Sequence, residues 1–141
     1  MQYVCDAPPY TWFRFETEGE AALESRAMSH AVEKYFHEQY ERAARSYVPP
    51  KSAHYVEQNI GLKGHIQKVM PRFLTLRDGE GRALVTAMLP PVGQDERAFR
   101  PIIVGVENTD PYPEYGGAIA KLGQHYKLAL EPGRCYPYRR G

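Results

Sequence analysis

The chain has 141 residues, of which 43% are hydrophobic and 25% charged, and its formal net charge is +1. This length fits one domain, residues 1–141, and the composition is that of a globular protein and excludes a disordered one. A net charge this small provides no long-range attraction to polyanions, so we expect neither nucleic acid nor a membrane as a partner.

Targeting segments and cysteine usage indicate the compartment. The first nine residues lack the apolar run of ~7–15 residues that a signal peptide needs. No stretch approaches the ~20 apolar residues that cross a bilayer. We therefore expect a cytoplasmic protein, in which the two cysteines, Cys5 and Cys135, are free thiols.

The first predicted elements are a strand at residues 10–17 and one long helix at about residues 18–47. Aromatic and polar residues alternate through the strand, which is the period of a β-strand. Thr17 and Glu20 then have the spacing of a capping box, which marks the start of a helix. Apolar residues recur at three- and four-residue steps along one face of the helix, so we expect it to lie on a sheet.

The length of this helix bears on assembly. Thirty residues would make a rod of ~45 Å, whereas a sphere of this chain length is roughly 37 Å across. The helix must therefore bend, protrude or be covered by a second copy of the chain. Bending is the simplest explanation, and a homodimer is the second.

Strands dominate the prediction after the helix. The clearest pair is a hairpin of residues 72–77 and 82–89, joined by a turn of Asp and Gly residues. Further strands are predicted at residues 54–60, 62–69, 102–106 and 135–139. Residues 107–117 are predicted as a loop, and residues 118–130 fit a helix or a strand. The fold class is therefore α+β, with one long N-terminal helix packed on, or wrapped by, a curved and mainly antiparallel sheet of about five to seven strands.

Histidines and glutamates share the polar face of the predicted helix. His30, Glu33 and His37 lie within about 80° of one another at ~100° per residue. Two imidazoles and a carboxylate are ligands that a divalent metal accepts, but the four-residue step from Glu33 to His37 matches no known metal-binding helix motif. We therefore interpret the face as solvated, with a metal site as the alternative, and we expect no cofactor.

Three further histidines provide an enzymatic alternative. His54, His65 and His125 fall in segments that resemble strands, where a histidine facing a cavity acts as a general base. No spacing of nucleophile, glycine loop or cysteine pair that marks a known catalytic class accompanies them. A structural histidine is the simpler interpretation of each.

The segment 107–117 is the best candidate for a binding surface. It is rich in proline, glycine and tyrosine, and long loops in small domains are often functional. Tyr112 and Tyr115 offer an apolar ring with a polar tip, which suits a wet interface, and Glu114 lies between them.

The sequence therefore predicts a ligand-binding or protein-interaction module that acts through residues 107–117, and a homodimer stays the second explanation for its long helix. The alternative is a small enzyme with a histidine acid–base or metal site in the concave face of the sheet.

Overall fold

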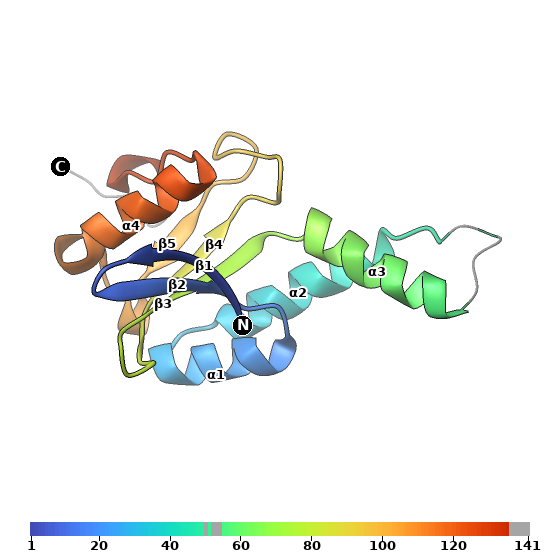
Figure 1. The fold of residues 1–141 in the computed structure, drawn as a ribbon, viewed down its shortest axis with the longest axis horizontal. Helices are drawn as coiled ribbons and strands as arrows, with labels where there is room; N and C mark the ends of the chain where they lie inside the picture. The colour runs from blue at the N-terminus through green and yellow to red at the C-terminus, as the bar shows by residue number, and fades with distance from the viewer. Residues whose placement is uncertain (50, 52–54, 136–141) are drawn as a thin grey trace.

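Five antiparallel strands form one sheet, in which strand order follows chain order. The computed structural model describes residues 1–49, 51 and 55–135, and Figure 1 shows the arrangement. The strands are β1 (Gln2–Ala7), β2 (Tyr10–Arg14), β3 (Arg72–Arg77), β4 (Ala83–Leu89) and β5 (Ile102–Val104). The α+β class is confirmed, and the described sheet has five strands where the sequence predicted five to seven.

Helices cover both faces of this sheet. They are α1 (Glu18–Met28), α2 (Val32–Arg45), α3 (Tyr55–Val69) and α4 (Tyr112–Tyr126), with 3₁₀ turns η1 (Val106–Asn108) and η2 (Pro132–Arg134). Figure 1 shows α4 on one face of the sheet and α1 on the other. Two cores result, one with α4 around Trp12 and Leu76, and one with α1 and α2 around Phe36 and Phe73.

The predicted single long helix is wrong, because the helix is interrupted between α1 and α2. The predicted start is confirmed, since the Glu20 backbone N–H donates to Thr17 Oγ1 at 3.1 Å. Ser29, however, takes a left-handed conformation, with φ 53°, and ends α1. The Glu33 backbone N–H then donates to Ser25 Oγ at 2.8 Å, which satisfies a first-turn donor of α2. The continuous rod was the premise for a second subunit, so a homodimer now has no support from helix length.

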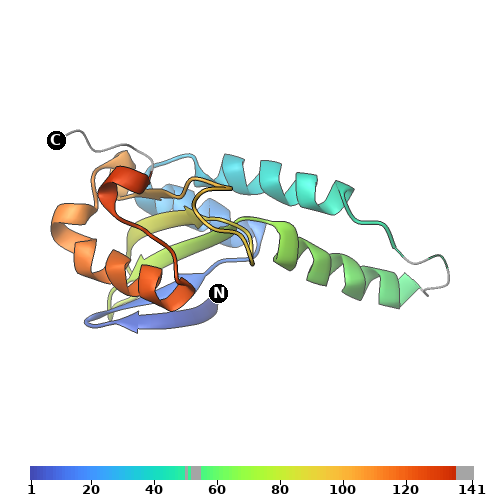
Figure 2. The same cartoon turned by 90° about the horizontal axis from the view of Figure 1, so that it is seen from above.

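Residues 55–69 form α3, and the two strands predicted at 54–60 and 62–69 are therefore wrong. The described side chains show a four-residue period, because Leu62, Ile66 and Met70 all join the core beneath α2. A Cβ at Gly61 would meet the hydroxyl group of Tyr47, which follows α2 in the chain. Figures 1 and 2 show α2 and α3 side by side, extending beyond the sheet.

The carboxyl-terminal third also differs from the prediction. Residues 112–117 belong to the first turns of α4 rather than to a loop, and the ambiguous segment 118–130 is helical to Tyr126. Pro111 precedes the helix and Pro113 lies in its first turn, where a missing backbone N–H costs nothing. Cys135 follows η2 outside any strand, and the rest of the predicted strand 135–139 lies outside the described residues.

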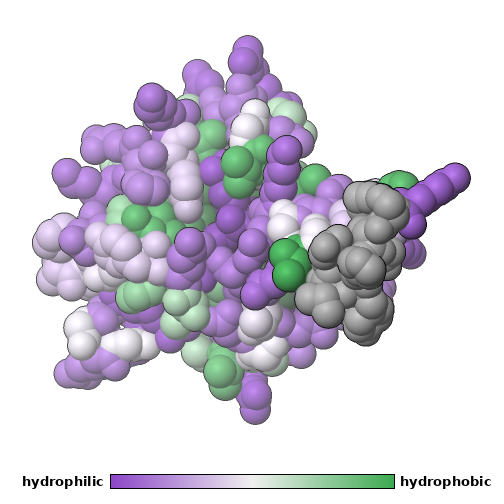
Figure 3. All heavy atoms as spheres, turned by 45° about the vertical axis from the view of Figure 1, so that its right-hand side comes forward, coloured by the Kyte–Doolittle hydropathy of each residue, from purple (hydrophilic) through white to green (hydrophobic). Residues whose placement is uncertain are grey.

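The predicted hairpin is confirmed by β3 and β4. Asp78 closes its turn, because its backbone N–H donates to the Arg82 carbonyl at 3.1 Å and Gly81 supplies a positive φ of 81°. The sequence analysis missed β1, which pairs with β2 across a turn of two prolines. On the molecular face shown in Figure 3, hydrophobic atoms form small separate areas among hydrophilic ones.

Candidate functional site

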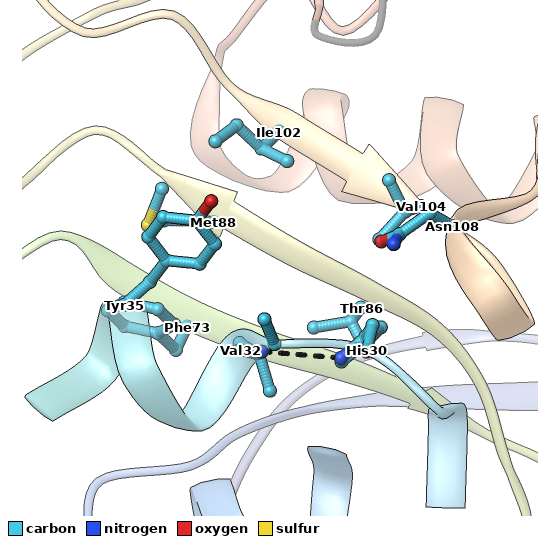
Figure 4. Close-up of a pocket in the computed structure, with 10 residues that line it drawn as sticks. His30, Val32, Tyr35, Phe73, Thr86, Met88, Ile102, Val104 and Asn108 are labelled. Carbon is cyan, nitrogen blue, oxygen red and sulfur yellow. Dashed lines mark hydrogen bonds between the residues drawn. The ribbon is translucent and has the colours of Figure 1, made fainter.

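A pocket of about 560 Å³ lies on the α1 and α2 side of the sheet, over β4 and β5. Its walls come from the break between α1 and α2, the first turn of α2, strands β3 to β5, and η1. The lining residues, drawn in Figure 4, are His30, Ala31, Val32, Tyr35, Phe73, Thr86, Met88, Ile102, Val104 and Asn108. Figure 2 shows that α2 runs beyond the sheet beside α3, and the pocket lies where the first turn of α2 meets the strands.

Strand alternation selects which side chains reach the pocket. On β4, Thr86 and Met88 face the pocket, whereas Val85 and Ala87 face α4. Successive side chains of a strand point to opposite faces of the sheet. A strand such as β4, whose two faces are both covered by helices, is therefore expected to carry apolar side chains on both faces. Thr86 is the exception on β4, since it is a hydroxyl that is only 3% exposed.

A hydrogen-bonded chain of four side chains explains the buried Thr86. Arg77 Nη2 donates to Glu24 Oε1 at 2.8 Å, and Thr86 Oγ1 donates to Glu24 Oε2 at 2.5 Å. Glu24 has no exposed surface, so Arg77 is the counter-ion that makes its burial tolerable. His30 Nε2 lies 2.9 Å from Thr86 Oγ1 and completes the chain at the pocket.

The direction of these bonds assigns the tautomer of His30. The hydroxyl of Thr86 has one proton, and the Glu24 carboxylate, which only accepts, takes it. Thr86 therefore accepts from His30, so Nε2 carries the ring proton and Nδ1 is the acceptor, 3.4 Å from the Val32 backbone N–H. Burial lowers the pKa of His30, against the attraction of Glu24, so the ring is neutral at pH 7.

Asn108 forms the opposite polar wall in a turn of unusual backbone geometry. Glu107 and Asn108 both have positive φ angles, 57° and 60°, which are uncommon for residues other than glycine. The turn is closed by the Gly105 backbone N–H, which donates to the Thr109 carbonyl at 2.8 Å. Figure 4 shows the Asn108 side chain beside Val104, and its amide makes no hydrogen bond within the part of the chain that the structure describes.

The three binding residues predicted in segment 107–117 lie elsewhere, on the α4 side of the sheet. The Tyr112 hydroxyl donates to the Leu130 carbonyl at 2.7 Å. The Tyr115 ring packs edge-to-face on Tyr10 with centroids 5.4 Å apart. Glu114 is exposed. Both tyrosines thus hold α4 in place, and their role in binding a partner stays a prediction.

The predicted metal ligands do not gather at one point. His37 bonds Glu18 at 2.6 Å and lies 3.3 Å from Glu41, while His30 faces Thr86 and Glu33 is exposed on α2. Among residues 1–49, 51 and 55–135, no group of three or more His, Cys, Asp or Glu could hold a metal ion.

The other histidines are not at the pocket either. His65 lies on α3, with Nε2 2.7 Å from Ser46 Oγ, and His125 is exposed on α4. His54 lies outside the described residues. The sequence analysis missed Glu24, although a carboxylate in the buried stripe of α1 between Ala21 and Met28 is a signal that could have revealed it.

Both cysteines are free thiols, as expected. Cys5 is partly buried and Cys135 is buried, and burial raises the pKa of each thiol, which makes both less reactive. No helix in the described ranges is long and apolar enough to span a membrane.

Comparison with protein-family models, with curated proteins and with solved structures finds no match for this chain. Any function of the pocket must therefore be inferred from its own residues and geometry.

Proposed function

We propose that this protein binds a small, mainly apolar molecule in the pocket between the start of α2 and strands β4 and β5. The observation that carries the proposal is the pocket's composition. About 560 Å³ is lined mostly by aliphatic and aromatic side chains, and the polar exceptions are His30, Thr86, Asn108 and the hydroxyl group of Tyr35. Small-molecule sites are typically of roughly 300–1,000 Å³ and combine an apolar lining with a few placed polar groups.

Binding is favoured over catalysis by the hydrogen bonds of His30. A general base needs a free nitrogen lone pair directed at its substrate. Nε2 of His30 donates to Thr86, and Nδ1 faces the backbone N–H of Val32. The Thr86 hydroxyl is bonded to Glu24 and to His30 and is only 3% exposed, so a substrate has little access to it. The same bonds hold the ring still, which is what a binding wall requires.

A dye-binding experiment tests the proposal. Nile red is neutral, and its fluorescence rises in apolar sites, so we expect saturable binding to the wild-type protein. Ala31 is exposed and lines the pocket, and Ala31→Trp places a large ring there. We expect this variant to bind the dye at least about tenfold more weakly, which corresponds to ~1.4 kcal/mol.

The matched control is Ala27→Trp. Ala27 is also exposed, one turn earlier in the chain, and it does not line the pocket. This variant should bind the dye as the wild-type protein does. The proposal fails if the wild-type protein shows no saturable binding, or if Ala31→Trp and Ala27→Trp, both folded by circular dichroism, bind equally well.

A further inference from the structure

The floor of the pocket is built from two rows of side chains with different chemistry. Register pairs Thr86 of β4 with Val104 of β5, and Met88 of β4 with Ile102 of β5. Successive rows on one face of a sheet lie about 7 Å apart, the length of two strand residues. The Thr86 row is therefore one end of the pocket and the Met88 row is the other.

The wall residues sharpen this division. Tyr35, Phe73 and Met88 line the end at the Met88 row, which is apolar except for the hydroxyl group of Tyr35 (Figure 4). His30 is bonded to Thr86, and Asn108 lies beside Val104, both at the other end. A bound molecule that satisfies both ends has an apolar body over the Met88 row and a polar head at the Thr86 row.

Charge restricts the head group. None of the ten lining side chains is acidic or a Lys or Arg, and His30 is neutral. Asn108 at the Thr86 end is exposed, so a head group there keeps contact with water, and the wall offers no counter-ion that would favour a charged head over a neutral one. Glu24 adds negative charge directly behind Thr86, and its partner Arg77 lies on the far side of Glu24 from the pocket end of the chain.

The hydrogen-bonding capacity of the lining residues identifies the one that recognises the polar head group of the ligand. The protons of Thr86 and of His30 Nε2 are both in use within the wall. At the polar end, Asn108 is the described lining side chain that keeps both a donor and an acceptor available. A primary amide is complementary to a group of the same kind, because each offers one N–H and one carbonyl in a plane.

We infer that the ligand has an apolar body and an uncharged, carboxamide-like head, which pairs with the side-chain amide of Asn108 beside Thr86. This inference rests on the proposed binding function. It adds the chemical class of the ligand, its orientation along the two rows, and the residue that selects it.

Three compounds with one apolar body test the inference: 4-phenylbutanamide, 4-phenylbutanoate and 4-phenylbutylammonium. Each competes with Nile red on the wild-type protein. We expect the amide to displace the dye at a concentration at least about tenfold lower than either charged compound.

Asn108→Gly is the decisive variant, because glycine keeps the positive φ of this position while the amide is removed. We expect it to lose the preference for the amide, so that the three compounds displace Nile red from this variant at similar concentrations, whatever its own affinity for the dye. Asn108→Asp keeps the size and adds a negative charge, so it should favour the ammonium compound over the butanoate.

The two proposals fail in different ways. If Nile red does not bind the wild-type protein, the proposed function is wrong. If the dye binds but the three compounds displace it equally, or if Asn108→Gly keeps the amide preference, the ligand class is wrong while the binding function stands.

Discussion

Replacing Thr86 measures what the buried side-chain network contributes to stability. Thr86→Val removes the hydroxyl while it nearly keeps the shape of the side chain. The Glu24 carboxylate then loses one of its two donors, and His30 Nε2 loses its acceptor, both in a region where Thr86 is only 3% exposed. Thr86→Ser keeps the hydroxyl and removes one methyl group.

The expected losses of unfolding free energy differ between the two variants. A hydrogen bond to a charged group contributes about 1.5–3 kcal/mol and a neutral one about 0.5–1.5 kcal/mol, so Thr86→Val should cost roughly 2–4 kcal/mol. One buried methyl group is worth about 1 kcal/mol, which is the expected cost of Thr86→Ser. The polar variant should therefore be the more stable one.

Urea unfolding followed by tryptophan fluorescence provides the measurement. Trp12 is the chain's single tryptophan and has no exposed surface when folded, so its emission reports the unfolding of the sheet. Equal slopes in urea would show that the variants unfold from comparable states. A Thr86→Val protein as stable as Thr86→Ser, or more so, would refute the hydrogen-bonded chain from Arg77 to His30.

Two further predictions concern packing and pH. Gly123→Ala should destabilise the fold by about 1–3 kcal/mol through overpacking, because the new Cβ would lie 2.8 Å from the Leu128 carbonyl oxygen. Gly117→Ala in the same helix has open space and should stabilise by about 0.5–1 kcal/mol; thermal unfolding of both proteins decides this, and a Gly123→Ala protein at least as stable as wild type would contradict it. The second prediction is the pH dependence of the stability that His37 contributes. The hydrogen bond of His37 to Glu18, together with the charge of Glu41, raises the pKa of His37 in the folded protein. The contribution of His37 to the free energy of unfolding is therefore complete below its unfolded pKa of about 6.5 and is lost as the pH rises through its folded pKa. The urea midpoint of wild type should exceed that of His37→Gln at acidic pH, and the difference should shrink toward pH 8, whereas a difference that grows with pH would show the opposite sign.

Local signals in the sequence predicted the elements whose causes are local. The capping pair Thr17 and Glu20 are three residues apart and form the expected bond. The hairpin of β3 and β4 depends on a turn whose residues bond one another, as Asp78 and Arg82 do. In both places the partners lie within four residues of each other in the chain, so spacing and residue type suffice.

Predictions failed where distant contacts outweighed local preference. Segment 62–69 has β-branched residues, Ile66 and Val69, that suit a strand, but Ile66 gains its burial by packing as part of a helix against α2. The stripe of residues 18–47 is continuous, yet the helix breaks at Ser29 and places the next residue, His30, against Thr86. Burial of an apolar face contributes more than the few tenths of a kcal/mol that separate most residues in propensity.

The sequence by itself determined which residues are available for a site. It determined the strand period that turns Thr86 and Met88 to one face, and the helical period that places Glu24 in the buried stripe of α1. Only the tertiary structure decided that Glu24, Thr86 and His30 meet. Glu24 and Thr86 are 62 positions apart in the chain, and His30 and Thr86 are 56 apart. Hydrogen bonds over such separations form when packing brings the elements together, and no local pattern encodes them. The pocket forms between the first turn of α2 and strands β3 to β5, so it is also a property of the assembled chain.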